Sequence, residues 1–124
     1  MERDEIKEIE EIKSAHGARP VEWLLEKYEV NGKWCLIHAT HMTKMETRAL
    51  AKTGAIAGLC PITEANLGDG IFNGPTFIEA GGTFGVGSDS NINISLTEEL
   101  RTLEYSQRLL HKERNLMRLA FLIY

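Results

Sequence analysis

The sequence predicts an α/β fold built on a parallel sheet. Three short apolar segments typical of buried strands, residues 34–37, 55–60 and 83–88, alternate with segments that carry helix signals. Strands that alternate with helices are typical of right-handed βαβ units, whose strands lie parallel in one sheet. Capping residues, prolines and glycines separate the segments, so the elements can be assigned in order along the chain.

Two helices are predicted before the first strand. The first, residues 4–14, carries an isoleucine at every third position from Ile6 to Ile12, which gives a narrow apolar stripe, and Gly17 ends it. Pro20 suits the first turn of the second helix, where a missing N–H costs nothing. The buried face of this helix is expected to follow i, i+3, i+4, i+7 spacing: Val21, Leu24, Leu25 and Tyr28.

The first strand follows a turn at Asn31-Gly32. Residues 34–37 (Trp-Cys-Leu-Ile) form a continuous apolar run, which is typical of a strand covered on both faces. Cys35 lies in this run and Cys60 lies at the end of the second strand. We therefore expect both to be buried, reduced thiols rather than disulfide partners.

The helices of the second half are predicted from their ends. Thr43 and Glu46 form a T-x-x-E capping box for a helix that reaches about Lys52. Residues 61–74 are rich in Gly, Asn and Asp and are predicted to be a loop, after which a short helix begins at Pro75 and ends at Gly81-Gly82. Ser95 and Glu98 form a second box for a long helix with an expected apolar side of Leu96, Leu100, Leu103 and Leu110.

The size of the chain predicts one domain, residues 1–124, that is part of a larger sheet. Three strands are few for an α/β domain, and a complete eight-stranded βα barrel needs about 250 residues. The apolar run 116–124 ends without a closing turn. Open sheet edges and an uncovered face would leave the isolated chain unstable, so we expect it to aggregate or to pair with a second copy.

Composition narrows the classes of partner and location. Hydrophobic residues make up 43% and charged residues 26%, as in an average folded domain. The net charge is −4 and the 14 basic residues are scattered, which argues against nucleic-acid binding. A charged N-terminus argues against a signal peptide, and no apolar run approaches the ~20 residues of a membrane span. We expect a cytoplasmic protein that acts on a small molecule.

Candidate functional residues follow the strands, because the carboxyl ends of parallel strands carry the active sites of such folds. His38 follows the first strand and Asp89 the third. Converging, they would suit metal-activated hydrolysis, with the carboxylate as metal ligand and proton acceptor and the imidazole as electrophile or acid. The alternatives are a hydrogen-bonded rim histidine and an aspartate that caps the next helix. His41 would complete an H-x-x-H pair, but i and i+3 point to opposite sides of an extended segment.

Other polar residues carry weaker signals. Glu64, Asn66 and Asp69 lie in the long predicted loop, and long loops in compact domains are often functional. Asn66 and Asp69 are equally suited to setting turns beside Gly68 and Gly70, and both interpretations remain open. The two remaining histidines lie in charged helical surroundings and are expected at the surface: His16 and His111.

Four strings resemble the formimidoylglutamate deiminase family of the amidohydrolase superfamily. They are WCLIHATH (34–41), GLCPITEANLGDGIF (58–72), FGVGSDS (84–90) and EELRTLEYSQR (98–108). The resemblance runs from about Glu8 to about Asn115. The second and fourth strings are much more specific than a histidine and an aspartate at two strand ends.

The resemblance implies a metal-dependent (β/α)₈ barrel of which this chain holds strands six to eight. It implies hydrolysis of N-formimino-L-glutamate to N-formyl-L-glutamate and ammonia, a step of histidine degradation, by a homodimeric enzyme. One divalent metal ion, usually zinc, would lower the pKa of water. His38 resembles the catalytic histidine after the sixth strand. Asp89 resembles the aspartate after the eighth strand, which ligates the metal and takes a proton from water.

The chain departs from the family pattern in its metal ligands. The family's H-x-H pair of the first strand has no counterpart, and residues 1–4 (Met-Glu-Arg-Asp) stand where its H-x-x-E is expected. A zinc site takes three or four protein ligands, so we expect the chain alone to hold no stoichiometric zinc and to be inactive. Two alternatives stay open: an aminohydrolase for a purine, pterin or triazine, and a non-catalytic half-barrel that dimerises.

Overall fold

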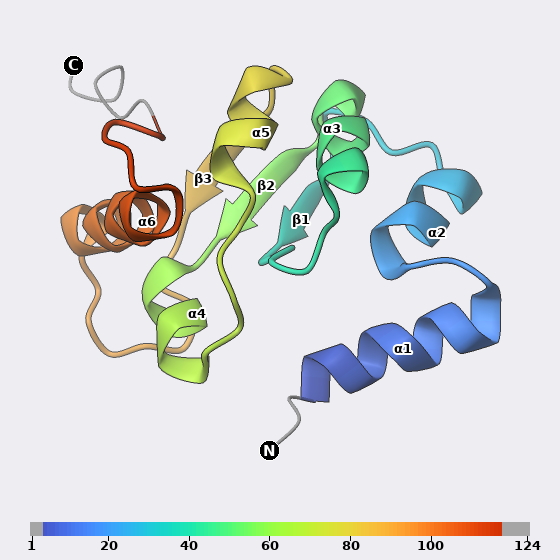
Figure 1. Ribbon diagram of the computed structural model, residues 1–124, viewed down its shortest axis with the longest axis horizontal. Coiled ribbons are helices and arrows are strands. Elements are labelled where there is room, and N and C mark those ends of the chain that lie inside the picture. Colours follow the sequence, from blue (N-terminus) through green and yellow to red (C-terminus); the bar gives the residue numbers. More distant parts are fainter. Residues whose placement is uncertain (1–3, 118–124) are drawn as a thin grey trace.

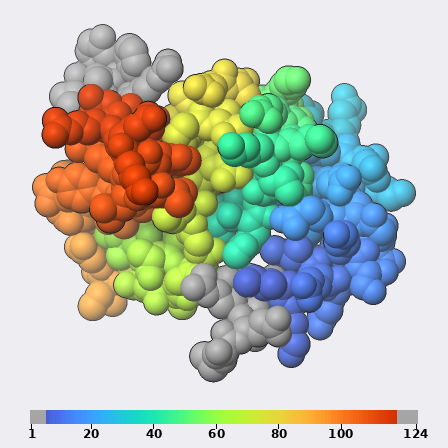
Figure 2. Space-filling model, viewed as in Figure 1, coloured from blue at the N-terminus to red at the C-terminus, as the bar shows by residue number. Residues whose placement is uncertain are grey.

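The computed structural model describes residues 4–117, which form a three-stranded sheet with helices along it (Figure 1). The strands are parallel in the order β1-β2-β3, which confirms the predicted parallel sheet. The elements follow one another across the molecule in sequence order (Figure 2). In chain order they are α1 (Asp4–His16), α2 (Pro20–Lys27), β1 (Cys35–Ile37), α3 (Lys44–Thr53), β2 (Ile56–Leu59), α4 (Pro61–Leu67), α5 (Gly74–Glu79), β3 (Thr83–Val86) and α6 (Leu96–His111).

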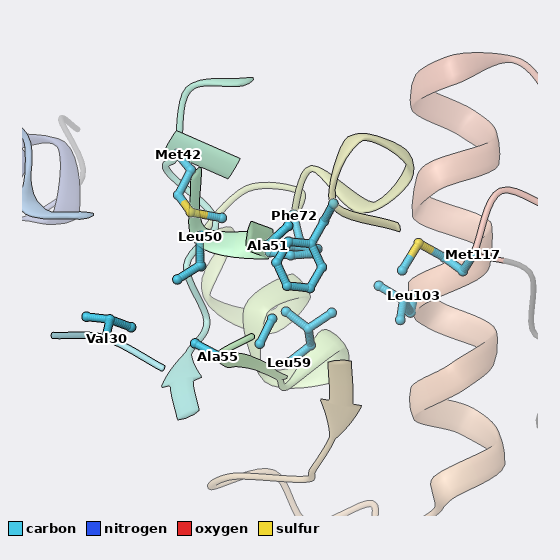
Figure 3. Close-up of a cluster of buried hydrophobic side chains, with 11 residues drawn as sticks. Val30, Met42, Leu50, Ala51, Ala55, Leu59, Phe72, Leu103 and Met117 are labelled. Atoms are coloured by element: carbon cyan, nitrogen blue, oxygen red, sulfur yellow. The ribbon is translucent and has the colours of Figure 1, made fainter. Parts of the chain in front are cut away.

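The core lies on one face of the sheet. Ala57 and Leu59 of the central strand have no exposed surface, and they pack in a cluster with Leu50 of α3, Phe77 of α5 and Leu103 of α6. Figure 3 shows how this cluster gathers side chains from the helices and strands around β2. A sheet with helices on one face buries every second residue of a strand.

The opposite face, called here the bare face, carries exposed apolar side chains among residues 4–117, and the prediction that the first strand is covered on both faces was wrong. Cys35 and Ile37 of β1 and Ile56 of β2 are exposed on it, Ile37 to 56%. β1 is an edge strand, and Ile37 borders a hollow that it shares with Ile12 of α1 and Trp23 of α2. The expected buried thiol is therefore confirmed for Cys60 and wrong for Cys35.

Helix α3 begins with the predicted capping box. Thr43 Oγ1 accepts a hydrogen bond from the Glu46 N–H, and Glu46 Oε1 accepts one from the Thr43 N–H. Glu46 Oε1 also lies 2.6 Å from Arg19 Nε at the start of α2. Burial raises the pKa of the Glu46 carboxyl, but these hydrogen bonds and the guanidinium charge lower it by more, so it lies below its ordinary value.

Helix α6 buries polar side chains rather than the predicted row of leucines. Leu103 is buried, but Leu96 and Leu110 are more than half exposed. The face turned inward carries Glu99, Glu104 and Gln107, each of which bonds the backbone of another segment. At its start, Ser95 Oγ accepts from the Glu98 N–H, whereas the Glu98 carboxylate pairs with Arg101 instead of closing a box.

Two further expectations changed. Residues 61–67, predicted as loop, form helix α4, which starts at a proline in its first turn and ends at Gly68 with φ of 71°. Tyr28, expected on the buried side of α2, is 51% exposed.

Of the apolar run 116–124, residues 118–124 lie outside the described part. Within residues 4–117, no helix is both long and apolar enough to cross a membrane.

Candidate active site

His38 and Asp89 come together at the carboxyl edge of the sheet, as their positions after β1 and β3 predict. His38 Nε2 lies 3.8 Å from Asp89 Oδ2. The Asp89 side chain is 41% exposed and that of His38 is 37% exposed, so both are open to a small molecule. At this separation the two groups are not hydrogen-bonded to each other, but both can contact the same bound atom.

The backbone at both positions takes a form that L-residues rarely adopt. The φ angles of His38 and Asp89 are 67° and 51°, in the left-handed region. The His38 N–H donates to the carbonyl of Gly58 on β2, and the Gly87 N–H donates to the carbonyl of Leu59. The central strand therefore anchors both flanking chains where they turn, and strained residues of this kind cluster at functional sites.

Glu64 holds the other side of the His38 ring. Its Oε2 lies 3.0 Å from His38 Nδ1 and accepts a 2.6 Å hydrogen bond from the Cys60 N–H. Glu64 is 5% exposed, because it lies in the first turn of α4 directly behind the end of β2. A carboxylate accepts hydrogen bonds, so the ring can donate from Nδ1 to Glu64 while its Nε2 faces Asp89.

Cys60 lies beside this pair. Its Sγ, one His38 nitrogen and one Glu64 oxygen are all within 4.8 Å of one another. Burial and the negative charges of Glu64 and Asp89 raise the pKa of the Cys60 thiol above its ordinary value. These effects favour the protonated thiol, and Glu64 already accepts two hydrogen bonds. Glu64 is therefore better suited to holding the His38 ring than to binding a cation.

A cavity of about 280 Å³ opens beside His38. It lies between α1, α2 and the loop after β1, and its lining includes Ile12, Val21 and His41. His41 is thus near the site but faces this cavity, and it is not in the group formed by His38, Cys60 and Glu64. The two outer histidines, His16 and His111, are exposed as expected.

The remaining candidates of residues 61–74 do not join the pair. Asn66 is exposed on α4, and Asp69 is buried in the turn that follows it. The Asp69 carbonyl accepts a hydrogen bond from Thr40 Oγ1, which ties this turn to the loop after β1. Gly68 and Gly70 have φ of 71° and 102° on either side of it. Asp69 also lines the cavity beside His38, so both interpretations of this residue stay open.

The Asp89 carboxylate fits a zinc-type metal as one ligand among several. Zinc accepts carboxylates, and the Asp89 carboxylate is accessible at the strand end. The Glu64 bond to Nδ1 is the kind of second contact that orients a histidine beside a metal. The arrangement suits hydrolysis in which Asp89 accepts a proton and His38 contacts the reacting group.

Sequence reasoning gave Glu64 no role, although a local signal was present. Pro61 followed three residues later by Glu64 is a helix start with an acidic N-terminal turn. Recognition of that start would have placed Glu64 directly after the end of β2. The glycines and the asparagine further along concealed it by making the whole stretch look like loop.

Comparisons with known proteins agree with this architecture. Residues 3–123 match the sequence profile of the amidohydrolase family. The formimidoylglutamate deiminase of Pseudomonas aeruginosa is 51% identical over 88% of this chain and 24% of its own length. The 5'-deoxyadenosine deaminase of Methanopyrus kandleri is 33% identical over 85% of this chain and 24% of its own. The chain thus spans about a quarter of the length of these relatives.

Solved structures give the same picture. An amidohydrolase from Brucella melitensis superposes with a TM-score of 0.87 at 61% identity, over 90% of this chain and 25% of that one. An adenosine deaminase from Xanthomonas campestris with bound zinc superposes with a TM-score of 0.81 at 21% identity, over 90% and 26%, which shows the fold alone. The resemblance and the predicted fold class, part of a barrel of the amidohydrolase type, are confirmed, and the chain belongs to the amidohydrolase family.

Proposed function

We propose that this chain forms part of a formimidoylglutamate deiminase and contributes an acid–base pair to its active site. The observation that carries the proposal is the placement of His38 between Glu64 and Asp89, with Nε2 3.8 Å from Asp89 Oδ2. The 51% identity to the Pseudomonas aeruginosa enzyme supports the substrate, N-formimino-L-glutamate. We also propose that the whole protein is a cytoplasmic homodimer.

Asp89 is the residue of this chain that would hold the metal ion. A bound divalent ion, which we propose is zinc, supplies the Lewis acidity that makes water nucleophilic at neutral pH. Since zinc takes three or four protein ligands, the others would come from elsewhere in the whole protein. The 124 residues alone are expected to bind no stoichiometric zinc and to release no ammonia.

The residues of the chain then divide the proton transfers. Water adds to the formimino carbon, the carbon–nitrogen bond to the terminal nitrogen breaks, and ammonia and the N-formyl product result. Asp89 accepts the proton of the attacking water, and both protons that the water loses end on the terminal nitrogen, which leaves as ammonia. His38, held by Glu64 with its Nε2 toward Asp89, contacts the attacked group and orients it. Proton transfer by a positioned side chain contributes about 10²–10⁴-fold in rate.

The test is ammonia release by the complete protein from N-formimino-L-glutamate. His38→Asn and Asp89→Asn are expected to lower kcat by about 10²–10⁴-fold. His111→Asn, an exposed histidine of α6, is the matched control and should leave kcat unchanged. Chelation should abolish activity and zinc should restore it.

A nucleoside aminohydrolase is the second candidate, because relatives at 33% identity or below are deaminases of adenine nucleosides. Offering the complete protein 5'-deoxyadenosine and related aminoheterocycles beside N-formimino-L-glutamate separates the two. Ammonia release from the nucleosides alone would overturn the deiminase proposal.

A further inference from the structure

We propose that Thr63 is a positioning residue that sets where Asp89 lies relative to His38. The proposal rests on the proposed function, because it takes these two residues as the reacting pair. Thr63 is the residue before Glu64 in the first turn of α4 and is 3% exposed. No role follows for it from its place in the sequence, since its stretch was predicted to be loop.

The side chain of Thr63 bonds the loop that carries Asp89. Its Oγ1 donates a 2.9 Å hydrogen bond to the carbonyl of Ser88, the residue before Asp89. The Asp89 backbone has φ of 51°, so the direction of its side chain depends on how its neighbours are held. A bond at the preceding carbonyl fixes one side of the peptide unit that leads into Asp89.

Two further residues brace the same contact. Asn91 Nδ2 donates to the Ser88 carbonyl and lies 3.2 Å from Glu99 Oε1 and 3.4 Å from Thr63 Oγ1. Glu99 of α6 is 2% exposed, and its Oε2 accepts from the N–H of Ile62 on α4. These bonds close a ring that joins the first turn of α4, the loop after β3 and the first turn of α6.

Apolar packing does little to hold this loop. Two of its apolar side chains, Ile92 and Ile94, are 100% and 85% exposed. Polar contacts therefore carry the positioning. The Thr63 hydroxyl is buried, and its removal would delete one of the two side-chain donors to the Ser88 carbonyl.

Consecutive residues of α4 thus hold both members of the pair. Glu64 fixes the His38 ring through Nδ1, and Thr63 fixes the loop of Asp89 through Ser88. Because both lie in one helical turn, that turn braces the His38 ring and the loop of Asp89 against each other. Loss of either bond is expected to separate the pair without removing a reacting group.

The test compares Thr63→Val with Thr63→Ser in the complete protein. Valine keeps the shape of threonine and lacks the hydroxyl, whereas serine keeps the hydroxyl. In T63V we expect the Nε2–Oδ2 separation in a crystal structure to grow by about 1 Å, a displacement that costs about 10²-fold in kcat. Zinc affinity, measured by chelator competition, should fall about 10–100-fold. T63S should restore the separation, kcat and zinc affinity.

The outcomes separate this proposal from the proposed function. An unchanged separation and affinity in T63V would overturn the positioning role, even if the protein is a deiminase. If the separation is longer in T63V and returns to its original value in T63S, the positioning role is supported. If the unmodified protein also releases no ammonia from N-formimino-L-glutamate, the deiminase proposal is overturned at the same time. If T63V does not fold, Asn91→Ala removes the other donor to the Ser88 carbonyl together with the contacts to Glu99 and Thr63, and an unchanged Nε2–Oδ2 separation in N91A would overturn the bracing of the Asp89 loop.

Discussion

Replacing Leu59 by alanine is expected to destabilise the chain far more than replacing Ile37, although both are aliphatic residues at strand ends. Leu59 has no exposed surface, whereas Ile37 is 56% exposed on the bare face. Either change removes three side-chain carbons, and full burial of three such carbons stabilises the folded state by about 2.4 kcal/mol. With the cavity left behind, Leu59→Ala should cost about 2–5 kcal/mol. Less than half of that burial exists at Ile37, so Ile37→Ala should cost about 1 kcal/mol.

Urea unfolding of the 124-residue chain, followed by circular dichroism, measures both costs. The titration is done at two protein concentrations, because a second copy that covers the bare face would make the midpoint concentration-dependent. Equal costs at Leu59 and Ile37 would refute the one-sided core. If the Ile37 cost also rises with concentration, then the face is covered by another copy of the chain, as the half-barrel alternative requires.

Three further predictions follow from individual contacts. The pKa of Glu46 is held below its ordinary value of 4.5, so its contribution to stability is present above pH 4.5 and is lost as the pH falls through the folded-state pKa. In urea titrations at acid pH, Glu46→Gln should flatten that part of the curve of stability against pH. An unaltered curve would contradict the assignment. Gly82→Ala places a Cβ 2.5 Å from the ring of Phe77. The free energy of unfolding should fall by about 1–3 kcal/mol. An unchanged free energy of unfolding would show that the ring moves aside at no cost. Exposed Cys35 should react with a thiol reagent much faster than buried Cys60, whose thiol pKa is raised. Mass spectrometry of the labelled peptides measures the two rates, and faster labelling of Cys60 would contradict the prediction.

Local signals in the sequence determined the elements that depend on neighbouring residues. The capping box of α3 and the proline in the first turn of α5 are complete within a few residues, so α3 begins where predicted and α5 begins one residue earlier, at Gly74. The prediction that His38 and Asp89 meet needed one more rule, that parallel strands end at one edge, and their 3.8 Å separation agrees with it. Their roles in catalysis remain predictions.

Tertiary structure decided what the local pattern left ambiguous. A short apolar run reads the same whether helices cover one face of its strand or both, so the exposure of Cys35 and Ile37 depended on where the helices pack. Likewise, Glu99 of α6 is buried because a backbone N–H of α4 and a side chain of the loop after β3 meet it. The partner on α4 lies 37 residues away in sequence and meets the buried carboxylate only after the chain has folded, so periodicity alone assigns this position to solvent.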